Sequence, residues 1–77
     1  MIKILLFADL QEKVGKPELE LKLEQITVEE LKSELQKIYP LINLESVMTA
    51  VNEEYAMADD AIKSGDTVAF IPPVSGG

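Results

Sequence analysis

Residues 18–38, ELELKLEQITVEELKSELQKI, contain the change of hydrophobic period that decides the fold. Three leucines alternate with polar residues over 18–23, which predicts a half-buried strand. Thr27-Val-Glu-Glu then fits a capping box, in which the Thr27 hydroxyl and the Glu30 carboxylate each accept from the other residue's backbone N–H. The apolar stripe that follows predicts a helix ending near Pro40, which cannot continue it: Val28, Leu31, Leu35 and Ile38.

The flanking sequence predicts further strands over 2–8, 47–51, 55–57 and 67–71, with turns at 52–54 and 64–66. Residues 9–17 predict one helical turn or a loop, closed by Gly15. A single amphipathic helix can cover only one face of a sheet. The first two strands are close enough in sequence to pair antiparallel, and the two most apolar strands, the first and the last, belong in the middle. We therefore expect an α+β, ubiquitin-like β-grasp domain over 1–71, with a mixed sheet of four to five strands.

The 77 residues contain no Cys, no His and no Trp, and all seven basic residues are Lys. These absences exclude disulfides, thiolate nucleophiles, iron–sulfur clusters and imidazole metal ligands. They also exclude the bidentate arginine clamp for phosphate. A domain of this size has few groups left over to build a catalytic cleft. We therefore expect that the chain is not an enzyme on its own and shares its chemistry with a partner.

The net charge of −7 repels a phosphate backbone, so nucleic acid and anionic membranes are not expected partners. No stretch approaches the length of a membrane span, and no cleavable leader is recognised, so a cytoplasmic protein is expected. The acidic pairs at 29–30, 53–54 and 59–60 are explained by helix capping, turns and solvation, and no metal site is expected. No glycine-rich phosphate loop follows a strand.

The last eleven residues, TVAFIPPVSGG, carry no charge in a chain that is 27% charged. Pro72 cannot donate to a sheet ladder, so the strand should end near Ile71 and Pro72-Pro73 should direct residues 72–77 outward as an extended segment. Gly76 and Gly77 have no Cβ, so their backbone fits a channel too narrow for other residues. This pattern indicates that the terminal carboxylate is the working group, which another enzyme must activate.

The sequence resembles the small, sulfur-carrying subunit of molybdopterin synthase, the MoaD family. The stretches that carry the resemblance are residues 2–8, 27–31, 50–52, 64–70 and 71–77. The resemblance covers the whole chain and is most specific in residues 71–77, IPPVSGG. It implies that Gly77 is adenylated with ATP by an activating enzyme similar to ubiquitin-activating proteins and converted to a thiocarboxylate with sulfur from a donor. The sulfur then passes to a cyclic pyranopterin phosphate in molybdenum cofactor biosynthesis. No permanently bound cofactor is implied.

The resemblance also implies a large-subunit partner, in a heterotetramer of two small and two large subunits. The segment that enters the partner's channel would comprise Pro72, Pro73, Val74, Ser75 and Gly76. An apolar sheet surface near it would form the interface, through Phe7, Phe70 and Ile71, although from the residues alone a core role for either phenylalanine is equally well supported. The chain departs from the family pattern at Gln11, where Arg is common, and at Glu53, where Gly is common.

Two alternatives remain open at this point. A ubiquitin-like protein modifier, or a sulfur carrier for thiamine or tRNA thiolation, would share the Gly-Gly end and the same activation. The Pro72-Pro73-Val74-Ser75 sequence favours the molybdopterin role. A simple interaction module is the third reading.

Overall fold

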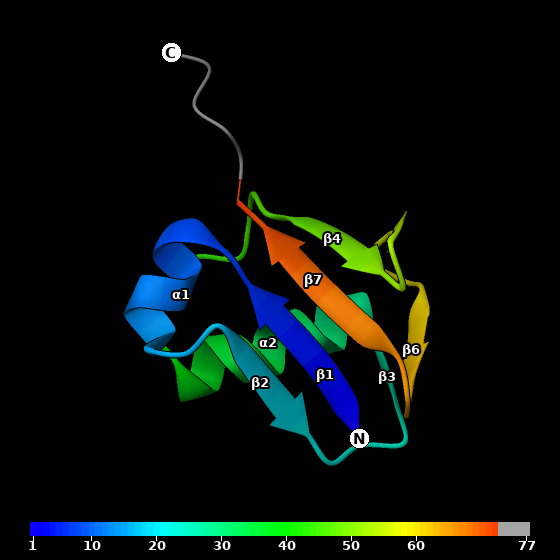
Figure 1. The fold of residues 1–77 in the computed structure, drawn as a ribbon. Helices are drawn as coiled ribbons and strands as arrows, with labels where there is room; N and C mark the ends of the chain where they lie inside the picture. Colours follow the sequence, from blue (N-terminus) through cyan, green and yellow to red (C-terminus); the bar gives the residue numbers. More distant parts are fainter. Residues whose placement is uncertain (73–77) are drawn as a thin grey trace.

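The computed structural model describes residues 1–72, which form two helices and seven strands (Figure 1). In chain order the elements are β1 (Ile2–Leu6), α1 (Ala8–Val14), β2 (Glu18–Leu21), β3 (Gln25–Thr27), α2 (Val28–Ile38), β4 (Met48–Val51), β5 (Glu54–Tyr55), β6 (Ala61–Lys63) and β7 (Thr67–Ile71).

The main sheet has five strands in the order β2-β1-β7-β4-β5. β1 and β7 pair in parallel, with Ile4 beside Val68 and Leu6 beside Phe70. The other pairs are antiparallel: β1 with β2, β4 with β7, and β4 with β5. The sheet is therefore mixed, with the first and last strands next to each other, and the expected ubiquitin-like β-grasp architecture is confirmed.

Helix α2 crosses one face of this sheet, behind it in Figure 1, and begins with the predicted capping box. The Glu30 N–H donates to Thr27 Oγ1 at 3.1 Å, and the Thr27 N–H donates to Glu30 Oε1 at 3.0 Å. Its buried side chains meet those of β1, β6 and β7 and of the loop between α2 and β4. The core comprises Ile2, Ile4, Leu6, Leu10, Val28, Leu31, Leu35, Ile42, Leu44, Val47, Ile62, Val68 and Phe70.

The short sheet formed by β3 and β6 was not expected from the sequence, because three residues are too few to display a period. It brings the 57–60 turn under the start of α2, where the Val28 N–H donates to the Asp60 carbonyl at 3.0 Å and the Glu29 N–H to the Ala58 carbonyl at 2.9 Å. Helix N–H groups that have no partner within the helix are thus satisfied. Asp60 also closes its own turn, because its carboxylate accepts from the Met57 N–H at 2.7 Å.

Several details differ from expectation. β4 begins at Met48 rather than Val47, and β5 is Glu54–Tyr55 rather than 55–57. β1 ends at Leu6 rather than Ala8, because α1 begins at Ala8, and α1 ends at Val14 with the C-cap Gly15, whose φ of 90° suits glycine. β2 ends at Leu21, so Leu23 lies outside it. Ile38, expected on the buried stripe of α2, is 54% exposed.

The β4–β5 hairpin turns through Asn52 and Glu53, whose φ angles are 51° and 70°. Two central residues with positive φ define the type I′ turn that matches the twist of a two-residue hairpin. Asn tolerates this conformation, whereas Glu does so at a cost. The departure at Glu53 therefore strains the turn and leaves the hairpin intact.

Replacing Glu53 with glycine should raise the free energy of unfolding by about 0.5–1 kcal/mol, because glycine has no Cβ to strain at positive φ. Urea unfolding followed by circular dichroism measures the change. The matched control is Glu54→Gly in β5, which has no strained φ to relieve and should be destabilising. A Glu53→Gly protein no more stable than the parent would show that the turn is not strained.

Candidate functional site

The candidate site begins where β7 ends. Ile71 is the last residue of β7 and Pro72 is the last residue that the structure describes. β7 is paired on both sides, with Ala69 between Leu5 of β1 and Ala50 of β4. The strand that precedes the C-terminal segment is thus held by two neighbouring strands. The predicted tail residues Pro73, Val74, Ser75, Gly76 and Gly77 lie outside the described residues, and their roles stay predictions.

Side chains of β7 alternate between the two faces of the sheet. Val68 and Phe70 point into the core and are fully buried, whereas Ala69 and Ile71 lie on the opposite face and are half-buried. Phe70 has no exposed surface, so the prediction that it contacts a partner is wrong: it anchors the end of β7 in the core. Ile71 remains a candidate contact residue.

The face of the sheet opposite α2, which we call the open face, carries a continuous apolar patch near the end of β7. Cross-strand partners share a face of a sheet, and the register aligns Leu5 with Ala69, Ala69 with Ala50, and Ala50 with Tyr55. Met48 is opposite Ile71 in the next row. Met48 is 48% exposed and Tyr55 is 74% exposed. The open-face patch is therefore Leu5, Met48, Ala50, Tyr55, Ala69 and Ile71.

Phe7 extends this surface at the end of the sheet where β7 finishes. It follows Leu6, the parallel partner of Phe70, and is the N-cap residue of α1 with 45% of its surface exposed. Because β1 and β7 run in parallel, their carboxyl ends lie at the same end of the sheet. The structure thus brings Phe7 and Ile71 to the same end of the sheet, as an interface there would require.

Sequence reasoning missed Leu5, Met48 and Tyr55. The continuous apolar run of the first strand gives no indication of which side chains point to which face. The relevant pairings join residues far apart in the chain, such as Met48 with Ile71. The available signal in the sequence was the presence of Met and Tyr after residue 47, since both residue types are common at protein interfaces.

A hydrogen-bonded cluster holds the other end of β7. The Asn52 side chain donates to Asp66 Oδ1 at 3.0 Å and accepts from the Thr67 N–H at 3.0 Å. Asp66 Oδ2 accepts from the Lys63 N–H at 2.8 Å. This bond from the Lys63 backbone, followed by the one from Asn52, lowers the pKa of Asp66 from its ordinary value of 3.8. The cluster joins the β4–β5 turn to the start of β7.

Glu30 and Asp60 have the capping and turn roles expected of their acidic pairs, whereas Glu54, expected in a turn, belongs to β5. Glu30 caps α2, and hydrogen bonds from the Thr27 backbone and then its side chain lower the pKa of Glu30. Asp60 closes a turn. Residues 1–72 contain no group of three or more carboxylates placed to hold a metal ion. Over the same residues, no helix is long and apolar enough to cross a membrane.

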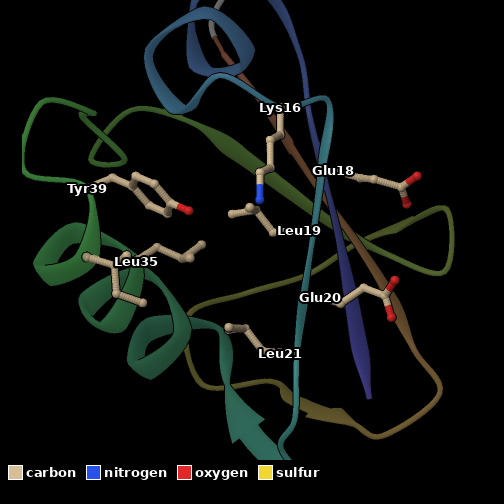
Figure 2. A pocket seen from close by; sticks show the side chains of 8 residues that line it. Lys16, Glu18, Leu19, Glu20, Leu21, Leu35 and Tyr39 are labelled. Atoms are coloured by element: carbon tan, nitrogen blue, oxygen red, sulfur yellow. The ribbon is translucent and has the colours of Figure 1, made fainter.

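A hollow of about 410 Å³ lies between β2 and the end of α2 (Figure 2). Leu19 and Leu21 face Leu35 of the helix, whereas Glu18 and Glu20 point away from it. Lys16 and Tyr39 stand at one end. One ammonium and one phenol beside an apolar floor do not make a nucleophile–base pair, so this hollow offers no catalytic arrangement of side chains.

A mixed sheet with its first and last strands parallel at the centre, crossed on one face by one long helix, defines a ubiquitin-like β-grasp protein whose chain end leaves the central strand. The chain belongs to the ThiS family, whose model matches residues 4–77.

Similar proteins cover the chain almost end to end. The molybdopterin synthase sulfur carrier subunit of Dictyostelium discoideum is 47% identical over 97% of this chain and 94% of its own. That of Escherichia coli is 38% identical over the full length of both chains. Among solved structures, the small archaeal modifier protein 1 of Methanosarcina acetivorans superposes with a TM-score of 0.80 at 28% identity, over 99% of this chain and 95% of that one.

The Asp66 cluster predicts a pH-dependent contribution to stability. Because the folded-state pKa is lowered, the ionised carboxylate stabilises the fold above the unfolded-state pKa of 3.8, and this contribution disappears as the pH falls through the lower, folded-state pKa. The stability difference between the parent and Asp66→Asn should be full above about pH 5 and shrink toward pH 2. Urea unfolding across this range measures it. A difference independent of pH would contradict the assignment.

Proposed function

We propose that the chain is the sulfur carrier subunit of molybdopterin synthase. The observation that carries the proposal is the full-length match to carrier subunits, 38% to 47% identical, in a chain whose sequence continues after the central strand β7 as Pro-Pro-Val-Ser-Gly-Gly. The match includes 100% of the Escherichia coli chain, so it extends through the C-terminal residues.

The chemistry follows from what the chain lacks. With no Cys or His, the chain offers no thiolate or imidazole on which sulfur could be carried. The main-chain carboxylate of Gly77 can carry it once it is activated. Its oxygen attacks ATP and releases pyrophosphate, which gives an acyl adenylate. A sulfur donor then delivers hydrosulfide to the acyl carbon, and AMP leaves, which yields the Gly77 thiocarboxylate.

The thiocarboxylate needs no side-chain base, because it is ionised near neutral pH and is a soft nucleophile. Its sulfur forms a bond to an electrophilic carbon of the cyclic pyranopterin phosphate, and a carbon–oxygen bond at that carbon breaks, so that the oxygen leaves with the phosphate or, after protonation, as water. Hydrolysis of the resulting thioester leaves the sulfur on the pterin and restores the carboxylate. ATP is consumed at the activating enzyme, and this chain holds no permanent cofactor. Catalysis resides in the partner proteins, and the cytoplasm is the proposed compartment.

The open-face patch supports a large-subunit partner. Its apolar side chains lie at and beside the end of β7, so a protein bound there would be next to the point from which residues 72–77 continue. Apolar side chains surrounded by charged surface are typical of a protein interface. Pro72 to Gly76 would enter the large subunit's channel, and two small and two large subunits would form the assembly.

A reconstitution tests the proposal. Incubation with ATP, the adenylating enzyme and a sulfide source should replace one carboxylate oxygen of Gly77 with sulfur, which intact-mass spectrometry detects. Deleting Gly77 should abolish both this exchange and pterin sulfuration, because the acyl group is then misplaced by one residue. Circular dichroism provides the control for folding, since every helix and strand described among residues 1–72 ends at or before Ile71. Wild-type sulfuration by the deletion variant would contradict the proposal.

The likeness to a small archaeal modifier protein supports one second candidate, a protein modifier that is activated in the same way. The two candidates differ in the final acceptor. A modifier forms an isopeptide bond between Gly77 and a lysine of another protein, whereas a sulfur carrier is recovered with its carboxylate restored. Mass spectrometry of tryptic digests from cells distinguishes these products, and abundant conjugates would favour the modifier.

A further inference from the structure

Strand β2 is an end strand of the main sheet, and no other strand among residues 1–72 pairs with its outer edge. The Leu6 N–H donates to the Pro17 carbonyl at 2.8 Å, which shows that Leu6 and Pro17 form a hydrogen-bonded pair at the end of the antiparallel β1–β2 ladder. Hydrogen-bonded pairs alternate along such a ladder, so Leu19 and Leu21 bond to β1. The N–H and C=O groups of Glu18 and Glu20 therefore point to the outer edge.

An apolar groove runs along this edge between β2 and α2. Its floor is the hollow of Figure 2, in which Leu19 and Leu21 face Leu35 and Lys16 stands at one end. Ile38 of α2 also lines this hollow. A second hollow, of about 330 Å³, continues it past Leu23 and Ile26. Ile38 belongs to the apolar stripe of α2 yet is 54% exposed, because nothing among residues 1–72 packs over it there. The groove thus presents apolar side chains at alternate positions of a free strand edge.

The opposite face of the same strand is acidic. Glu18 and Glu20 lie on the open face, where Lys3 is opposite Glu20 in the ladder. The Lys3 ammonium is 3.7 Å from the Glu18 carboxylate. On the open face one ammonium thus faces two carboxylates, whereas Lys16 and Lys22, which flank β2, line the two hollows beside α2. A strand added to β2 would place every second side chain against the two carboxylates.

We propose that β2 and α2 form a docking site for an extended segment of a partner protein in which apolar and basic residues alternate. The segment adds to β2 as an antiparallel strand. Its basic residues lie opposite Glu18 and Glu20 and exchange backbone hydrogen bonds with them. Its apolar residues enter the groove against Leu19, Leu21 and Ile38. This site uses neither the C-terminal segment nor the open-face patch.

Charge disfavours a second copy of this chain in the register where two β2 strands overlap fully. That antiparallel pairing would place Glu18 of one copy opposite Glu20 of the other, and like charges directly opposite each other are destabilising. A register shifted by two residues would place Glu18 opposite Lys22, so self-association is an outcome that the test distinguishes. The two carboxylates themselves favour lysine or arginine directly opposite them on an added strand.

The test uses a capped heptapeptide in which three valines alternate with two lysines between terminal glycines. Titration into the ¹⁵N-labelled full chain should shift the amide signals of residues 18–21 and 35–39, and protect the Glu18 and Glu20 amides from hydrogen exchange. N-methylation of the two lysine amides should abolish binding, because those amides donate to β2. Replacing the lysines with glutamates should weaken binding about fivefold or more.

Matched variants locate the site. Glu20→Lys and Ile38→Ser should each weaken peptide binding about fivefold, because one removes the cross-strand attraction and the other an apolar side chain that lines the groove. Glu53→Lys, in the turn at the opposite edge of the sheet, and Met57→Ser, which is also exposed, should leave it within about twofold. Shifts elsewhere, equal binding of the N-methylated or glutamate peptide, or dimerisation through β2 seen by sedimentation would each overturn the proposal.

Discussion

The parallel pairing of β1 with β7 is the constraint on which the rest of the structure depends. It places the last strand at the centre of the sheet, between β1 and β4. Hydrogen bonds beyond the ladder fix the start of both strands: the Gly65 N–H donates to the Met1 carbonyl at 2.8 Å, and the Lys3 N–H to the Asp66 carbonyl at 3.1 Å. With Phe70 buried at the far end, β7 is anchored along its length. The residues after Pro72 therefore continue from a fixed point.

Much of this architecture could be predicted from the sequence because the signals are local. The capping box at Thr27 and Glu30, the 3.6-residue period of α2 and the strict alternation over 18–23 each involve residues close in the chain. The central position of the first and last strands also followed from their apolar composition. The β3–β6 pair could not be found in this way, because it joins two three-residue segments about 36 positions apart, such as Ile26 and Ile62.

The candidate site was only partly predictable for the same reason. Gly77 and the segment before it stand out in the sequence by composition alone. The open-face patch depends instead on strand register, which decides whether Phe70 or Ile71 points outward. A shift by one residue reverses the faces, and no local pattern in an all-apolar strand records the phase. Exposed Ile38 is a related case, since the period of the helix does not show which of its apolar side chains are covered by the rest of the fold.

The absence of Cys, His and Arg acquires a meaning from this geometry. In the proposed function, the folded domain supplies a scaffold with partner surfaces, and the reactive group is generated on the main-chain carboxylate of Gly77. A carrier built in this way needs no side-chain catalyst, but it does need a surface that positions its terminus in another protein's active site. The open-face patch is that surface in our account, and it is the claim most in need of a direct test.

The most direct measurement is the affinity of Met48→Arg for the large subunit of molybdopterin synthase, determined by calorimetry beside the parent and Met57→Arg. Met48 is in the open-face patch and 48% exposed, whereas Met57 is 72% exposed and outside the patch. We predict that Met48→Arg binds at least about tenfold more weakly with unchanged thermal unfolding, because a charge is then buried in an apolar contact, and that Met57→Arg binds as the parent does. Equal affinities for all three chains would contradict a partner interface on the open face.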